Sequence, residues 1–186
     1  MRNPGARYEG TRHNLGGDVV AIVAERLGAG FRRAPRFIRA EVAETRIGDT
    51  RTVLARPTTF MNESGQAVAP LVRYYSTVPD DLLVVHDDID LPFTKLRVQR
   101  GRGPGGNNGV ASVIGSVGPD FWRLKLGVGR PPGRQDPADY VLQRFAARER
   151  EEAALMAQHA ADVVEVFVTE GAEAARQLAG ARSLRD

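Results

Sequence analysis

The 186-residue chain contains no cysteine, only three histidines and two lysines, and no long run of apolar residues. Without cysteine it can form no disulfide, no thiolate nucleophile and no cysteine-ligated metal site. No stretch of about 18 apolar residues could cross a membrane as a helix, and the first residues lack the apolar run of a secretory signal. These absences predict a cytoplasmic protein without a membrane-spanning helix.

The rest of the composition is ordinary for a globular protein, apart from its arginine content. Apolar residues make up 42% and charged residues 26% of the chain, whose length suffices for one domain with a sizeable core. Arginine outnumbers lysine 24 to 2, and basic residues cluster at 32–39 and 95–102. Because the guanidinium fork pairs bidentately with phosphate oxygens, these clusters favour a phosphate-bearing partner; a solvated basic surface is the alternative on charge alone.

Alternating strand-like and helix-like segments predict an α/β fold. Strands are expected at 51–56, 82–88, 95–100 and 122–129, and helices at 18–27, 64–75, 107–117 and 149–168. This alternation is typical of a three-layer α/β/α domain, in which ligands bind at the carboxyl ends of the strands. Three polar loops follow predicted strands and mark the expected site: P-T-T-F-M-N, H-D-D-I-D and G-R-G-P-G-G-N-N-G, which begin at residues 57, 86 and 101.

The loop H-D-D-I-D places carboxylates at the end of an apolar strand, where their burial costs free energy unless a partner is present. Side chains alternate along a strand, so His86 is expected to point away from Asp87, whose partner would be a histidine from another loop. Two alternatives stay open. His86, Asp88 and Asp90 share a face and could bind a metal ion, or Asp88 and Asp90 shape the turn that follows.

The glycine-rich loop matches the dinucleotide-binding pattern G-x-G-x-x-G at Gly101, Gly103 and Gly106, between a predicted strand and a predicted helix. No acidic residue follows at a strand end about 20 residues later, and Asn107-Asn108 replace the Lys-Ser/Thr of a phosphate-binding P-loop. A dinucleotide-dependent enzyme is therefore a weak alternative, although small residues before a helix N-terminus still favour an anion.

No serine-nucleophile or zinc-protease motif occurs, so an enzyme of this sequence would use histidine as a general base on water, with a carboxylate to orient it. His13 lies in a glycine-rich loop near the start, whereas His159 falls within a predicted helix and is not expected to act as a catalyst. Side-chain amides could hold the reacting carbonyl, although asparagine also favours turns and helix caps. Every asparagine of the chain lies in a suspected loop: Asn3, Asn14, Asn62, Asn107 and Asn108.

Four blocks of sequence, in this order, resemble the bacterial peptidyl-tRNA hydrolase family: N-P-G-A-R-Y-E-G-T-R-H-N, P-T-T-F-M-N-E-S-G, V-V-H-D-D-I-D-L-P and G-G-N-N-G. The resemblance runs from Asn3 to about Phe145 and includes F-W-R-L-K-L-G-V-G-R-P; the C-terminal helices, about 147–180, match less well. It implies one domain over residues 1–186, with a twisted, mixed, mainly parallel sheet. It also implies hydrolysis of the ester between a peptide, or an N-blocked amino acid, and the 3′ ribose of tRNA. This reaction recycles tRNA from stalled translation and needs neither metal nor cofactor.

By the matching motifs, the resemblance implies that His13 deprotonates water and that Asp87 orients His13 and stabilises its imidazolium. Asn3 would hydrogen-bond the peptide main chain and distinguish a blocked aminoacyl group from a free one. The enzyme is expected to be a cytoplasmic monomer that binds the acceptor end and 3′ CCA of its substrate. The other expected contacts are Tyr8, Phe60, Asn62 and Asn108 at the 3′ end, with Asn62 or Asn108 as oxyanion donors, Met61 lining the pocket, and Lys125, Arg97 and Arg100 at tRNA phosphates.

Some features depart from the family pattern. Only two residues precede Asn3, where the family has an apolar strand, so we expect a sheet without that strand, Asn3 on a frayed end, and a natural start further upstream. Asn107 replaces a common histidine with a modest expected effect, and Gln99 replaces an often basic residue that Arg97 and Arg100 flank. The last residues lack the family's terminal helix pattern. A non-catalytic RNA-binding relative on the same scaffold is the main alternative, although such a protein would not need both members of the histidine–aspartate pair.

Overall fold

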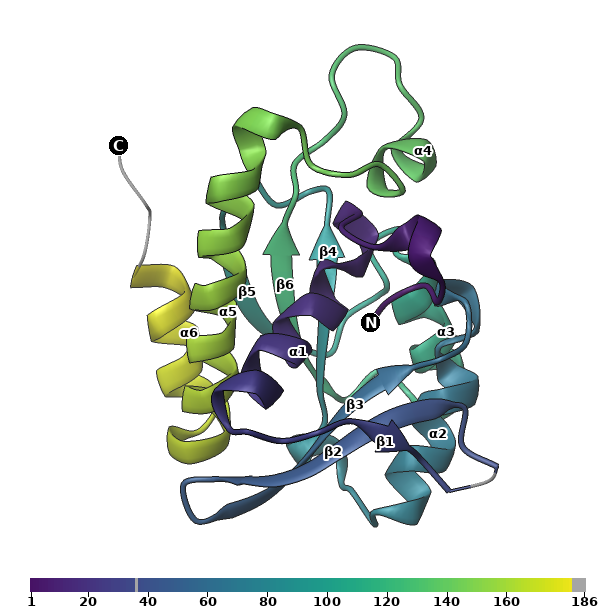
Figure 1. Cartoon of the computed structure of the whole chain (residues 1–186), viewed down its shortest axis with the longest axis vertical. Helices are drawn as coiled ribbons and strands as arrows, with labels where there is room; N and C mark the ends of the chain where they lie inside the picture. Colours follow the sequence, from purple (N-terminus) through teal and green to yellow (C-terminus); the bar gives the residue numbers. More distant parts are fainter. Residues whose placement is uncertain (36, 182–186) are drawn as a thin grey trace.

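The computed structural model describes residues 1–35 and 37–181 (Figure 1). Its helices are α1 (Leu15–Arg26), α2 (Gly65–Tyr74), α3 (Asn108–Val117), α4 (Pro137–Val141), α5 (Arg150–Glu170) and α6 (Ala172–Ala181). Its strands are β1 (Arg32–Arg33), β2 (Ala40–Ile47), β3 (Thr50–Pro57), β4 (Leu83–Asp88), β5 (Leu96–Arg100) and β6 (Trp122–Gly127). Every predicted strand and helix is present, whereas β1, β2 and α4 were not predicted. None of the described helices is long and apolar enough to span a bilayer.

Helices cover both faces of β4, which confirms the three-layer α/β arrangement. Val85 of β4 packs in one core with Val19 of α1 and Val163 of α5. The preceding residue, Val84, faces a second core that contains Val110 of α3. Figure 1 shows α5 and α6 on one side of the molecule and α2 and α3 on the other. Because both of its faces are apolar and covered, β4 has the continuous apolar sequence expected of a buried strand.

The described strands form two three-stranded sheets, ordered β1-β2-β3 and β4-β6-β5. The second sheet is mixed, as expected, but neither sheet is mainly parallel. Among the strands that the structure describes, only β4 and β6 pair in parallel; the β1–β2, β2–β3 and β5–β6 pairs are antiparallel. The reason is the length of the connections. A tight turn at Gly48 and Asp49 joins β2 to β3, whereas a parallel pair needs a long crossover, which β5 and α3 provide between β4 and β6. As predicted, no described strand precedes α1. Strands β3 and β4 are edge strands of separate sheets, which was not predicted.

Helix α1 and strand β4 approach each other closely at Gly16. A Cβ atom at this position would lie 2.2 Å from the backbone oxygen of Val85, so only glycine permits the contact. The short 3₁₀ turn η2 (Arg12–Asn14) directly precedes α1. The close contact therefore brings η2, with His13, to the carboxyl end of β4.

The first residues pack against β4, and the expectation that Asn3 lies on a frayed end is wrong. The Met1 ammonium donates a hydrogen bond of 2.6 Å to the Val85 carbonyl, and the Met1 side chain is buried with Met61 and Val110. Asn3 itself is only 7% exposed. Contacts with residues distant in sequence thus fix Met1 to Asn3, although residues at the start of a chain are often free of such contacts.

Candidate active site

A polar pocket of about 530 Å³ opens at the carboxyl end of β4, where the sequence places the site. Turn η2, the 57–62 loop, the end of β4 and the glycine-rich loop supply its walls. The structure brings together all the residues predicted for catalysis and 3′-end contact: Asn3, Tyr8, His13, Phe60, Met61, Asn62, Asp87 and Asn108. Another wall, which the sequence analysis missed, comes from α4 and its flanks: Asp136, Pro137, Ala138, Val141 and Leu142.

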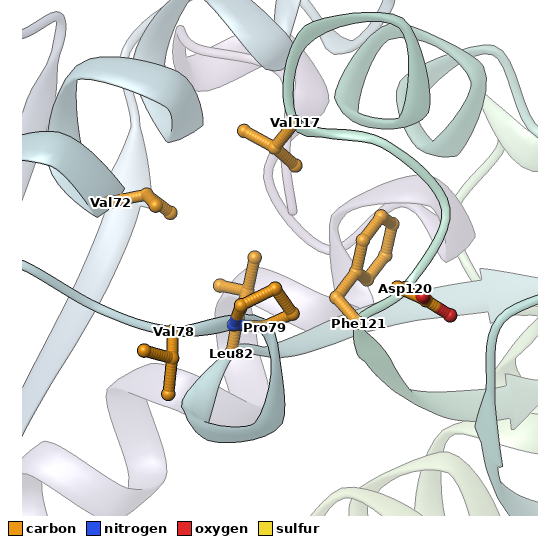
Figure 2. Close-up of a pocket in the computed structure, with 7 residues that line it drawn as sticks. All are labelled: Val72, Val78, Pro79, Leu82, Val117, Asp120 and Phe121. Atoms are coloured by element: carbon orange, nitrogen blue, oxygen red, sulfur yellow. The ribbon is translucent and has the colours of Figure 1, made fainter.

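A second hollow lies at the opposite end of β4 and is shown in Figure 2. Its volume is about 40 Å³, and its lining is apolar apart from Asp120: Val72, Val78, Pro79, Leu82, Val117 and Phe121. A space of this size with one ionisable side chain cannot assemble a reaction on a large substrate. The polar pocket is therefore the candidate active site.

His13 and Asp87 form the central contact of the pocket. The Nδ1 atom of His13 lies 2.9 Å from both carboxylate oxygens of Asp87, and the two side chains are 13% and 2% exposed. An ionised carboxylate can only accept hydrogen bonds, so Nδ1 must carry the proton in this contact. The neutral ring then has its lone pair on Nε2, which is the arrangement of a general base whose tautomer is fixed by a carboxylate.

Asn107 joins this pair and caps a helix at the same time. Its Nδ2 donates to the backbone oxygen of Asp87 at 3.2 Å and to the carboxylate Oδ1 at 3.3 Å, while its Oδ1 accepts from the amide of Val110 at 3.1 Å. The second contact is an N-cap of α3. The sequence analysis expected only a modest effect from Asn107 in place of histidine. Its position directly before a predicted apolar helix could have indicated the N-cap.

His86 supports Asp87 from the buried side of β4. Its Nδ1 donates to the backbone oxygen of Asp87 at 2.7 Å and makes no contact with the carboxylate. Burial lowers the pKa of His86 from 6.5 to about 4, although the hydrogen bond to Asp87 opposes this shift. His86 is thus neutral at neutral pH and acts as a structural donor.

Asn3 is held by reciprocal hydrogen bonds with Asn14 of η2. The Asn3 amide donates to Asn14 Oδ1 at 2.8 Å, and Asn14 Nδ2 donates to the Asn3 backbone oxygen at 3.0 Å. The side-chain Oδ1 of Asn3 accepts from the amide of Met61 at 2.7 Å. Because Oδ1 is occupied, Asn3 offers its Nδ2, a hydrogen-bond donor, to a ligand in the pocket. The structural role of Asn14 depends on this tertiary contact and was not predicted.

Two aromatic rings lie at the pocket mouth. Tyr8 and Phe60 meet edge to face, with their centroids 6.4 Å apart, and Phe60 is 51% exposed. The guanidinium of Arg7 lies 4.5 Å from the Tyr8 centroid. Asn62 and Asn108 are also exposed at the pocket. The half-buried ring of Tyr8 and the exposed ring of Phe60, beside amides, provide stacking surfaces and donors of the kind that bind an unpaired nucleotide.

The glycine-rich loop forms a wall of the pocket as predicted, and its path depends on left-handed backbone. Gly105 and Gly106, both pocket-lining, have φ angles of 61° and 78°. Beneath the loop, Arg123 of β6 donates to the backbone oxygen of Gly103 at 3.0 Å and to that of Gly101. Arg123 is 2% exposed, and burial lowers the pKa of its guanidinium. The sequence analysis did not identify this support.

The residues expected at tRNA phosphates do not line the pocket. Lys125 forms an ion pair with Asp88, and the two side chains are 16% and 8% exposed. Burial alone would raise the pKa of Asp88, but the hydrogen bonds from Lys125 and the Asp90 amide, together with the positive charge of Lys125, outweigh it, and the pKa is lowered. Arg97 lies opposite Lys125 on the edge strand β5 and is exposed, and Arg100 pairs with Asp80 at 2.5 Å.

The alternative metal site at the end of β4 is not formed. His86 donates to a backbone oxygen, Asp88 pairs with Lys125, and Asp90 pairs with Arg130. Across the part of the chain that the structure describes, no three histidine, aspartate or glutamate side chains gather in a group that could hold a metal ion. Asp88 does shape the turn, as the other alternative expected, because its Oδ1 accepts from the amide of Asp90 at 2.8 Å.

The α/β fold and a pocket that contains a histidine–carboxylate pair beside side-chain amides define a hydrolase as the class of protein. The sequence matches the peptidyl-tRNA hydrolase family over residues 1–185. It is 49% identical to the peptidyl-tRNA hydrolase of Frankia alni, over 93% of this chain and 87% of the relative, and 46% identical to that of Mycobacterium tuberculosis, over 95% and 92%. The structure is similar to the crystal structure of peptidyl-tRNA hydrolase from Acinetobacter baumannii, with a TM-score of 0.91 at 30% identity, over 97% of this chain and 91% of that one. The chain belongs to the peptidyl-tRNA hydrolase family and is an enzyme of that family.

Proposed function

We propose that this chain hydrolyses the ester bond between a peptide, or an N-blocked amino acid, and the 3′ ribose of tRNA, with His13 as the general base. The observation that carries the proposal is the contact of His13 Nδ1 with both oxygens of the buried Asp87 at 2.9 Å. Membership in the peptidyl-tRNA hydrolase family supports the choice of substrate. The enzyme would act as a single-domain monomer in the cytoplasm and recycle tRNA from stalled translation.

The proposed reaction needs only water and the side chains of the pocket. His13 Nε2 accepts a proton from water as the water oxygen attacks the ester carbonyl carbon. The bond from that carbon to the ribose oxygen then breaks, and the imidazolium returns the proton to this oxygen, which becomes the ribose hydroxyl. The products are a peptide with a free carboxylic acid and intact tRNA. General-base catalysis supplies about 10²–10⁴-fold of the rate, and Asp87 stabilises the imidazolium while it exists.

Asn3 is proposed to select N-blocked substrates. Its free Nδ2 can donate to the carbonyl oxygen of the first peptide bond or of a blocking acyl group. A free aminoacyl ester has an α-ammonium there instead, which is itself a donor and carries no lone pair. The selectivity would arise because two donors cannot satisfy each other, and a desolvated polar group without a partner is costly.

The 3′ end of tRNA is proposed to bind across the exposed side of the pocket. Tyr8 and Phe60 would stack with the terminal base, and Met61 would line the floor beneath the ester. Asn62 and Asn108 would donate to the ribose or to the developing oxyanion, a contribution of about 10²–10³-fold for one such donor.

The remaining basic residues are proposed to contact the phosphates of the acceptor stem. Arg97 is the best placed, because it is exposed on β5 and no described carboxylate pairs with it. Arg100 shares its charge with Asp80, and Lys125 can reach a phosphate only by leaving Asp88. Binding through such contacts weakens as salt rises, because counterion release drives it.

The test is the release of an N-acetylated amino acid from tRNA, measured with the wild type, His13→Ala and Asp87→Ala. Asp162→Asn is a matched control, because Asp162 is an ion-paired carboxylate on α5, away from the pocket. The proposal expects both pocket variants to lose most turnover while tRNA binding persists. If the variants hydrolyse as fast as an active wild type, His13 and Asp87 are not the catalytic pair. If the wild type binds tRNA without hydrolysis, the non-catalytic RNA-binding alternative holds instead.

A further inference from the structure

The pocket wall formed by residues 136–142, here called the roof segment, needs an external support. It contains α4, a helix of only five residues, and supplies Asp136, Pro137, Ala138, Val141 and Leu142 to the pocket. So short a helix is not stable on its own in water. Figure 1 shows α4 at the end of the molecule, within the long connection from β6 to α5 and next to the first turns of the chain.

The support comes from Arg12, the residue that precedes His13 in turn η2. The Arg12 amide donates to the backbone oxygen of Gln143 at 3.1 Å, directly after the roof segment. In its side chain, Nη1 donates to the Arg144 backbone oxygen at 3.1 Å, and Nη2 donates to Glu149 Oε2 at 2.7 Å. Arg12 is only 4% exposed, so its charge is withdrawn from water and depends on these partners.

The same guanidinium also lies over two aromatic rings. Its carbon lies 4.1 Å from the ring centroid of Tyr140 and 5.0 Å from that of Phe145. Tyr140 belongs to α4, and its hydroxyl donates to the backbone oxygen of Val128 at 3.1 Å. One side chain therefore contacts α4, the connection that follows it, and Glu149 before α5.

Backbone contacts strengthen the same connection. Thr11 forms an isolated antiparallel bridge with Arg144, whose Nε donates to the backbone oxygen of Glu9 at 3.0 Å. These bonds join residues 9–12 to residues 143–144, and His13 follows directly in the chain. The position of the roof segment over the pocket and the position of the imidazole depend on one set of contacts.

We propose that Arg12 is a positioning residue that holds the roof segment over the pocket and couples it to the catalytic turn. The inference rests on the proposed function, since the pocket is taken to bind the acyl end of peptidyl-tRNA. A lysine at this position would keep the charge but lose the planar fork, and with it the simultaneous bonds to Arg144 and Glu149. The roof segment would then open more often, and substrate would be held less tightly.

The experiment compares Arg12→Lys with the wild type by kinetics on N-acetyl-aminoacyl-tRNA and by hydrogen exchange of residues 136–145. The expected result is a KM raised about tenfold or more, from the loss of a charge-assisted hydrogen bond, with faster exchange in the roof segment. The pH dependence of kcat should stay as in the wild type, because His13 and Asp87 are retained. Arg26→Lys is the matched control, since Arg26 joins α1 to Asp162 and Glu165 of α5 at 2.9 and 3.0 Å, outside the pocket.

Three results are distinguishable. A wild type without hydrolysis contradicts the proposed function itself. If the wild type is active but Arg12→Lys has the same KM and the same roof-segment exchange, the positioning role is overturned. This holds even if the Tm of the variant falls, because a merely structural residue would lower Tm alone. If Arg12→Lys does not fold, Glu149→Gln, which keeps an oxygen acceptor for Arg12 and for the Ala146 amide, is measured in the same way. Like Arg12→Lys, Glu149→Gln should raise KM and speed up hydrogen exchange in the roof segment. Wild-type values for both quantities would overturn the proposal.

Discussion

His13 and Asp87 are 74 residues apart in the sequence, yet Nδ1 of the one lies 2.9 Å from each carboxylate oxygen of the other. The symmetric contact leaves the imidazole a single neutral tautomer, with its basic nitrogen free to meet water. Asp87 in turn is held by donors to its backbone oxygen from His86 and Asn107. These hydrogen bonds hold Asp87, and through it His13, in place without a bound substrate.

Asp87→Asn should lower kcat by about 10³-fold or more, while the Kd for tRNA changes little. The amide is isosteric, but its NH₂ group can face Nδ1 and force the proton onto Nε2, which removes the basic lone pair. Single-turnover hydrolysis and filter binding on the same preparation give the two values. A variant that retains a tenth or more of the wild-type rate would show that Asp87 does not fix the tautomer.

Asn107→Ser should separate the two roles of Asn107. Serine is a good N-cap, so α3 and the free energy of unfolding should change by less than about 1 kcal/mol. Its shorter side chain cannot reach Asp87, so kcat should fall. Urea unfolding and steady-state kinetics measure the two effects, and Asn107→Ala, which loses both contacts, should show a deficit in each. Wild-type kcat in the serine variant would remove Asn107 from the support of Asp87.

Asn3→Asp should weaken the preference for N-blocked substrates. The carboxylate keeps an acceptor for the Met61 amide but replaces the Nδ2 donor with a second acceptor, which suits an α-ammonium. The ratio of kcat/KM for N-acetyl-aminoacyl-tRNA to that for free aminoacyl-tRNA should therefore fall, and competition between the two substrates measures it. Asn62→Asp is the comparison, because it changes charge in the same pocket but leaves the acceptor of the Met61 amide, Asn3 Oδ1, in place. An unchanged ratio in Asn3→Asp would assign the selection to another group.

The stability of the fold should fall as pH drops below 6.5, partly because of His86. The pKa of His86 is about 4 in the folded chain, against 6.5 for the ordinary side chain. Between these values the unfolded state binds a proton that the folded state does not, so lowering the pH favours unfolding. The contribution approaches about 3 kcal/mol at pH 4. Urea unfolding of the wild type and His86→Gln should show a smaller loss in the variant; parallel curves would contradict the assignment to His86.

More of the pocket than of the sheet topology could be predicted from the sequence. Strand β4 and the loops around it were predicted because an apolar run that ends in carboxylates has few other structural interpretations. The contents of the pocket followed from the resemblance, since no spacing rule links His13 to Asp87. The parallel content of the sheet was overestimated because pairing depends on connections such as the tight turn at Gly48, and β2 gave no clear alternation.

The supporting residues escaped prediction for a common physical reason. Asn14, Asn107, Arg12 and Arg123 act through hydrogen bonds to backbone groups distant in sequence. A polar residue in a loop reads as a turn former or as a solvated surface until its tertiary partner is known. The ion pair of Lys125 with Asp88 is of the same kind, because alternation along β6 gives no sign of the partner across the sheet.

The central claim, that His13 activates water with Asp87 behind it, is tested most directly by His13→Ala with and without added imidazole. Single-turnover hydrolysis of N-acetyl-aminoacyl-tRNA should fall by about 10²-fold or more, with an unchanged Kd for tRNA, and free imidazole should restore part of the rate. Restoration is expected only while Asp87 is present, so His13→Ala/Asp87→Ala should not respond. A His13→Ala enzyme that hydrolyses the substrate at the wild-type rate would contradict the account.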